Sequence, residues 1–97
     1  MYPGGAGNTF DLGYYCDTHI PMARRLLGAA LKGVSVDAGI AGGEIGAPAP
    51  YLAIGHLMFD SMDAFVAAFT PVVGELQGDI PKYTNSKPTI QISDVKI

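Results

Sequence analysis

The sequence predicts an α+β fold in which helices cover one face of an antiparallel sheet, with elements in the order β-α-β-β-α-β. Two long segments carry apolar residues at helical spacing, and each is followed by a segment with strand character. One of the predicted strands, residues 51–59, is apolar on both faces, which is typical of a central strand. The length of 97 residues suits a single domain, 1–97.

The first strand of this order is short in the sequence. Only residues 1–3 stand before the glycine-rich turn that begins at Gly4, where a central strand of the sheet should lie. We therefore expect a truncated first strand, and we expect the natural chain to contain residues upstream of Met1.

The first helical segment begins near Thr9, and either Thr9 or Asn8 can cap it. Asp11 falls in its first turn, where a negative charge complements the helix dipole. Pro21 has no N–H to donate to the preceding turn, so we expect a break near His19. A second helical piece is predicted over residues 22–31, and Gly33 is expected to end it.

Two strands follow the first helical segment. Residues 34–40 alternate between apolar and small or polar side chains, which predicts a half-buried strand. Residues 41–50 carry three glycines and two prolines and predict an irregular loop. Residues 51–59 then form the strand that is apolar on both faces, and we expect it at the centre of the sheet.

The second helical segment begins at Ser61, a favoured capping residue, with Asp63 in the first turn. Thr70 followed by Pro71 resembles a new cap and first-turn proline, so we expect the helix to restart there. Residues 78–88 are rich in turn formers, and residues 89–97 alternate as a last strand.

This order of elements is that of the ferredoxin-like fold. Because its helices cover only one face of the sheet, the apolar residues on the other face need a different cover, and a second copy of the chain is the simplest one. The composition agrees with this, since 48% of the residues are hydrophobic and only 15% are charged. We therefore expect a homodimer that pairs sheet to sheet.

Composition also argues against several classes of protein. A net charge of -3 without a basic stripe argues against a nucleic-acid partner. No apolar run is long enough to cross a membrane, and the start of the chain lacks the pattern of a signal peptide, so we expect a cytoplasmic protein. One cysteine and two histidines are too few for a typical structural zinc site, and we expect no metal.

A polar aromatic stripe marks the first helical segment. On an α-helix Asp11, Tyr15 and His19 are spaced four apart and share one face, and Tyr14 lies beside them. A histidine titrates near neutrality and an aspartate can orient it, so the stripe could supply an acid or base to a pocket. The alternative is structural, with the tyrosines packing at the edge of the core and His19 capping the helix before Pro21.

Three further residues are candidates for binding a substrate. His56 lies within the central strand and is either a hydrogen-bonded core histidine or a base in the pocket. Asp79 and Tyr83 follow the second helix and could close a pocket over it, although Asp79 could equally cap the turn at Pro81.

Three stretches of the sequence are distinctive, namely "YPGGAGNTFDLGYYCDTHIPM", "PAPYLAIGHLMFDSMDAF" and "LQGDIPKYTNSKPTIQIS". In these stretches the chain resembles the EthD family, which is named for the degradation of ethyl tert-butyl ether. The resemblance covers nearly the whole chain. Family members normally have several strand residues before the Tyr-Pro-Gly-Gly turn, whereas here Met1 directly precedes Tyr2.

The resemblance implies a ferredoxin-like monomer that pairs into a dimeric α/β barrel, with a cavity between helices and sheet in each subunit. Relatives in this barrel class include cofactor-free oxygenases, lactone isomerases, polyketide cyclases and haem enzymes. The family is associated with catabolic oxygenase gene clusters.

Two functions follow as hypotheses. The first is a cofactor-independent enzyme, either of the oxidoreductase type or a simple acid-base catalyst, acting on a small hydrophobic or aromatic metabolite. In it His19 is the acid or base, and Asp11, Tyr14 and Tyr15 orient it or the ligand. The second is a binding or accessory protein that carries an intermediate for a partner oxygenase. A purely structural dimer would need no polar stripe.

Overall fold

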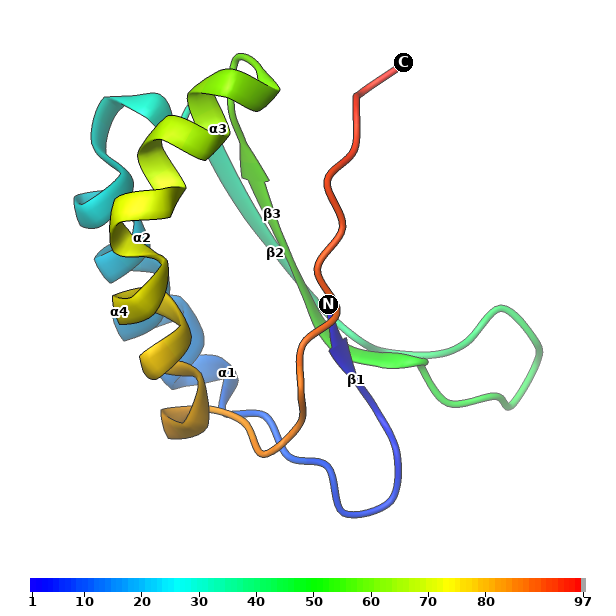
Figure 1. Cartoon of the computed structure of the whole chain (residues 1–97). Coiled ribbons are helices and arrows are strands. Elements are labelled where there is room, and N and C mark those ends of the chain that lie inside the picture. Colours follow the sequence, from blue (N-terminus) through cyan, green and yellow to red (C-terminus); the bar gives the residue numbers. More distant parts are fainter. Residues whose placement is uncertain (97) are drawn as a thin grey trace.

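The computed structural model describes residues 1–96 and shows an α+β fold, as predicted. Its antiparallel sheet has the strand order β1-β3-β2, and its helices lie on one side of that sheet (Figure 1). The strands are β1 (Tyr2–Pro3), β2 (Gly33–Ala38) and β3 (Tyr51–Met58), and the helices are α1 (Leu12–Tyr14), α2 (Ile20–Leu27), α3 (Met62–Phe69) and α4 (Val73–Gly78). None of the helices in the described part of the chain is both long and apolar enough to span a membrane.

The first helical segment contains a widened turn. Asp11, rather than Thr9 or Asn8, is the N-cap of α1, and its carboxylate accepts a hydrogen bond from the Tyr14 N–H. A π-helical turn, Tyr15–His19, then joins α1 to α2, and the Ile20 N–H donates to the Tyr15 carbonyl. One residue, Ile20, separates this turn from Pro21, whose ring crowds the turn before it, so the predicted break is a widened turn with one extra residue.

Helix α2 ends earlier than predicted. Its last residue is Leu27, because Gly28 adopts a φ of 63°, a left-handed conformation that favours glycine, and a 3-10 turn follows over Gly28–Ala30. The expectation of a helix reaching Leu31 was therefore wrong.

The second helical segment agrees with the sequence. The Ser61 side chain accepts a hydrogen bond from the Ala64 N–H and caps α3. A 3-10 turn, Thr70–Val72, carries Pro71 near its start, and the chain continues into α4. The restart predicted at Thr70 is confirmed.

Strand β3 is the central strand, as predicted, and its two faces differ. In the register of β3 with β2, Val36 lies opposite Gly55 and Ser35 opposite His56. Ala53, Gly55 and Leu57 face the helices, since Ala53 and Leu57 pack in the two core clusters and Gly55 adjoins Tyr15. The alternate residues, Leu52, Ile54, His56 and Met58, therefore occupy the opposite face, called the open face below.

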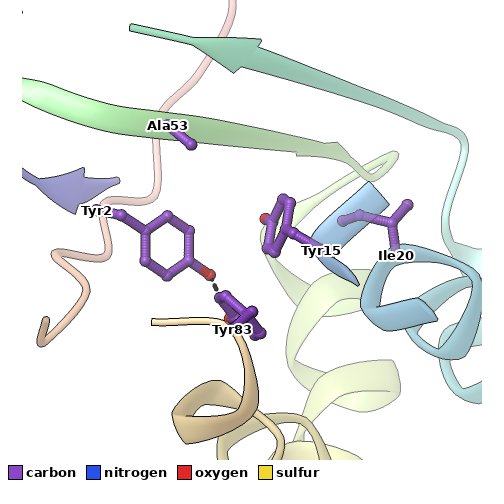
Figure 2. Close-up of a cluster of buried hydrophobic side chains, with 5 residues drawn as sticks. All are labelled: Tyr2, Tyr15, Ile20, Ala53 and Tyr83. Atoms are coloured by element: carbon purple, nitrogen blue, oxygen red, sulfur yellow. Dashed lines mark hydrogen bonds between the residues drawn. The ribbon is translucent and has the colours of Figure 1, made fainter. Parts of the chain in front are cut away.

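The core has two clusters between helices and sheet. One joins Tyr2, Tyr15, Ile20, Ala53 and Tyr83, whose side chains converge from β1, the first helical segment, β3 and the segment that follows α4 (Figure 2). The other joins α2 to α4 through Ala23, Leu27 and Leu76. The first cluster is mostly aromatic and holds the polar groups considered below.

The last predicted strand, residues 89–97, is not formed over residues 89–96, and residue 97 lies outside the described residues. Thr89 exchanges two backbone hydrogen bonds with Met1, which places this segment beside β1, where the fourth strand of the fold belongs. Because β1 is two residues long, it offers few backbone groups to which residues 89–96 could hydrogen-bond as a strand. Ile90 and Ile92 consequently remain exposed.

Candidate functional site

Asp79 joins two polar side chains from the first helical segment. Its Oδ1 accepts a hydrogen bond of 2.8 Å from the Tyr14 hydroxyl, and its Oδ2 lies 2.9 Å from His19 Nδ1. Only 6% of Asp79 and 7% of His19 is exposed. Residue 79 directly follows α4, so the packing of α4 on α2 brings this carboxylate to the π-helical turn.

Burial favours the neutral form of Asp79, but the hydrogen bonds from His19 and Tyr14 favour the carboxylate more strongly. Together with the Lys82 ammonium, 3.7 Å from Oδ1, they hold the pKa of Asp79 below its ordinary value. The hydrogen bond to this carboxylate in turn raises the pKa of the Tyr14 hydroxyl. Asp79 is therefore an ionised acceptor at neutral pH, and Tyr14 a donor.

The ionised Asp79 fixes the tautomer of His19. A carboxylate can only accept, so Nδ1 of His19 carries a proton and donates it to Oδ2. Nε2 then holds a lone pair whenever the ring is neutral. Within residues 1–96 no hydrogen bond reaches Nε2, and no fully buried side-chain nitrogen lacks a partner, so Nε2 keeps some accessible surface.

Aromatic rings enclose the His19 imidazole. Tyr15 is stacked on it, with ring centroids 5.3 Å apart and planes 15° apart, and Tyr83 lies against it at 4.8 Å. The Tyr83 hydroxyl is 2.7 Å from the Tyr2 hydroxyl, in the hydrogen bond drawn in Figure 2. Burial raises the pKa values of these three tyrosines, so they are neutral hydrogen-bonding groups.

Gly55 provides the space for Tyr15. A Cβ at residue 55 would overlap the Tyr15 hydroxyl, so the ring approaches β3 closely only because residue 55 has no side chain. The neighbouring positions on the same face, Ala53 and Leu57, both carry side chains. Gly55 and the π-helical turn together set the position of the Tyr15 and His19 rings.

Asp11 and His56 do not join this group. Asp11 is exposed and caps α1, so its carboxylate is bound to the Tyr14 backbone and not to His19. His56 lies on the open face, on the other side of the sheet, where its Nε2 is 2.9 Å from Asp37 Oδ2. The remaining candidates from the sequence come together around His19, namely Tyr14, Tyr15, Asp79 and Tyr83.

Sequence reasoning missed two residues of the site and one role. Tyr2 and Gly55 were not singled out, and Asp79 was expected to bind substrate rather than to hold His19. Asp79 is 60 positions from His19, so no local spacing indicates their contact. Tyr2 belongs to the Tyr-Pro-Gly-Gly turn, which indicates the end of a strand and not a site residue.

His19 does not line either of two surface hollows on residues 1–96. One, of about 530 Å³, lies outside Tyr83. Its lining is Thr9, Phe10, Asp11, Pro81, Lys82, Tyr83, Thr84 and Asn85. Tyr83 both lines this hollow and contacts the imidazole of His19. The other, of about 280 Å³, lies at the base of the loop between β2 and β3.

Comparisons with known proteins agree with the resemblance found in the sequence. The family model for the EthD domain matches residues 8–87. Among solved structures, the crystal structure of an EthD-like protein from Ralstonia eutropha JMP134 is similar over 100% of this chain and 87% of that one, with 41% identity and a TM-score of 0.94. No match was found among curated proteins.

Proposed function

The chain belongs to the EthD domain family, and we propose that it is an acid-base enzyme acting on a small hydrophobic, oxygenated or aromatic metabolite, without a cofactor. One observation carries the proposal, namely a buried aspartate that holds Nδ1 of His19 and leaves Nε2 as the basic nitrogen. This is the arrangement by which an aspartate prepares a histidine to accept a proton.

The charges around His19 suit a proton transfer. When Nε2 takes a proton from a ligand, the imidazolium that forms lies 2.9 Å from an ionised carboxylate, which stabilises it. The Tyr14 hydroxyl fixes the other oxygen of the same carboxylate. Asp79 and Tyr14 are thus positioning residues, and His19 is the catalytic residue.

The aromatic surroundings favour a planar, weakly polar ligand. Tyr15 and Tyr83 present ring faces and edges next to the imidazole, and aromatic groups pack well against such surfaces. Removal of a proton from an enol, a phenol or an activated carbon would begin an isomerisation, a cyclisation or a reaction with oxygen. An oxidoreductase and an isomerase or cyclase are both compatible with this first step.

A binding or accessory protein is the second candidate. His19 is closely packed, and neither of the two hollows includes it in its lining. A ligand could then bind outside Tyr83 without reaching the imidazole. In that case the Asp79–His19 pair would only stabilise the fold.

We also propose a homodimer that pairs through the open face. Strand β3 carries Leu52, Ile54 and Met58 on that face, the helices lie on the other, and Met58 is 44% exposed. Light scattering of the whole chain should give the mass of a dimer, and a monomer at micromolar concentration would contradict this part of the proposal.

The enzyme hypothesis is tested by ligand-dependent thermal stabilisation at pH 6 and pH 8. Aromatic and ether-derived acids and alcohols are screened with the native chain, His19→Ala and Asp79→Asn. The matched controls, His56→Ala and Asp37→Asn, break a second histidine-aspartate pair of the same 2.9 Å length on the open face.

Acid-base catalysis predicts that hits stabilise the native chain and the controls but have at least about tenfold lower affinity for His19→Ala. Once a hit is turned over, loss of the base should lower the rate by roughly 10²- to 10⁴-fold. If every hit stabilises His19→Ala and the native chain equally at both pH values, His19 is structural and the binding protein is the better description.

A further inference from the structure

On the open face, β2 and β3 carry one pair of ionisable side chains among apolar residues. From β3 it presents Leu52, Ile54, His56 and Met58, and from β2 it presents Ser35 and Asp37. His56 Nε2 lies 2.9 Å from Asp37 Oδ2, across the two strands. The side chains are 44% and 63% exposed, so both are hydrated in the isolated subunit.

No other charged side chain belongs to these strands. Asp37 is the one charged residue of β2, and β3 has only Tyr51 as a further ionisable group. Lys32 and Asp60 lie beyond the ends of the strands near Met58 and pair with each other at 3.8 Å. On the far side of β3, β1 contributes Pro3, which has no charge, and the Met1 ammonium that precedes it donates to the Thr89 carbonyl at the sheet edge. The net charge that β2 and β3 present on the open face therefore depends on whether His56 is protonated.

A second copy of the chain is the partner that this face suits. A twofold axis places the same surface against itself, so any net charge on the face meets an equal charge of the same sign. With His56 neutral, two unbalanced Asp37 carboxylates would enter one apolar interface, which is unfavourable. With His56 protonated, each copy contributes an internally neutral ion pair, and the apolar surfaces can meet without repulsion.

We infer that the open face is a proton-linked self-association surface, on which His56 becomes protonated when two copies meet. The inference rests on the dimer of the proposed function and adds its regulation. Histidines titrate between about pH 5 and 8, so dimerisation should be strong at the acidic end of this range and weaken toward the basic end. Each dimer takes up at most two protons, one per subunit, so its Kd can change by at most about 100-fold per pH unit.

Sedimentation equilibrium of the whole chain at pH 6, 7 and 8 tests the link, with native chain, His56→Gln and Asp37→Asn compared at each pH. The dimer Kd of the native chain should rise at least about tenfold from pH 6 to pH 8. In His56→Gln this dependence should disappear. In Asp37→Asn it should reverse, since an imidazole without its carboxylate enters an apolar interface more readily when neutral.

A His19→Gln variant tests whether the other histidine causes the pH dependence of the dimer Kd. We expect this variant to keep the pH dependence of the native chain. A dimer whose Kd is the same at pH 6 and pH 8, or a native response that persists in His56→Gln, overturns the inference and leaves the proposed dimer standing. A chain that is monomeric at every pH overturns both. Neither result touches the test of His19 by thermal stabilisation, so failure of the enzyme hypothesis is recognised separately.

Discussion

Replacement of Asp79 by asparagine should destabilise the fold much more than the same replacement at Asp37. The Asp79 carboxylate is buried and accepts hydrogen bonds from His19 and Tyr14, whereas Asp37 pairs with His56 and its side chain is 63% exposed. A hydrogen bond to a buried charged group contributes about 1.5–3 kcal/mol, and an exposed ion pair about 0.2–1 kcal/mol.

The asparagine side chain keeps one acceptor but loses the charge, so Asp79→Asn should lower the free energy of unfolding by about 2 kcal/mol at pH 7. For a domain of this size, 1 kcal/mol shifts Tm by about 4–8 °C, so a fall of roughly 8–16 °C is expected. Asp37→Asn should lower Tm by no more than a few degrees. Thermal unfolding followed by circular dichroism measures both.

The pH dependence gives a second check on Asp79. Its pKa is lower in the folded chain than the ordinary value of 3.8, so its stabilisation is present above that value and is lost as the pH falls through the folded pKa. The difference in Tm between the native chain and Asp79→Asn should therefore shrink as the pH falls below 4. Equal effects of the two substitutions at pH 7, or a difference that persists in acid, would refute the reasoning.

Two further predictions concern the aromatic cluster. Gly55→Ala should destabilise the chain, because the added methyl overlaps the Tyr15 hydroxyl, and Tyr15→Phe in the same chain should restore part of the lost stability. Chemical denaturation of the single and double variants measures the coupling between the two positions. Additive effects of the two substitutions would contradict the prediction. Tyr2, Tyr15 and Tyr83 should stay protonated past pH 10, the ordinary tyrosine value, because burial raises their pKa values. The stabilisation from these tyrosines is complete below pH 10 and is lost as the pH rises further. Their phenolate absorbance should therefore appear together with unfolding. Ionisation of all tyrosines in the folded chain would contradict the argument from burial.

The parts of the fold that sequence predicted well depend on neighbouring residues. Ser61 caps α3 through the backbone three positions later, and Pro71 restarts the helix one residue after Thr70. The central position of β3 followed from apolar residues on both of its faces, a property of the strand alone.

The parts that sequence could not predict depend on distant partners. Asp11 was placed in line with His19 on an ideal α-helix, but the widened turn before Pro21 changes that alignment, and Asp79 from the end of α4 is the residue that reaches the imidazole. The strand expected after Pro88 needed a paired edge on β1, which offers two residues. Neither outcome can be predicted from the local pattern of residues.

The chain has two histidines, and the sheet separates them. His19 lies among the helices and His56 lies on the open face, each with an aspartate at 2.9 Å. In a proton NMR spectrum the carbon-bound ring protons of these residues would give one set of signals from each side of the molecule. A small molecule that enters the aromatic cluster should move the His19 signals, and a second subunit should move those of His56. Ligand binding and subunit association can thus be followed in the same sample, through native side chains and without a label.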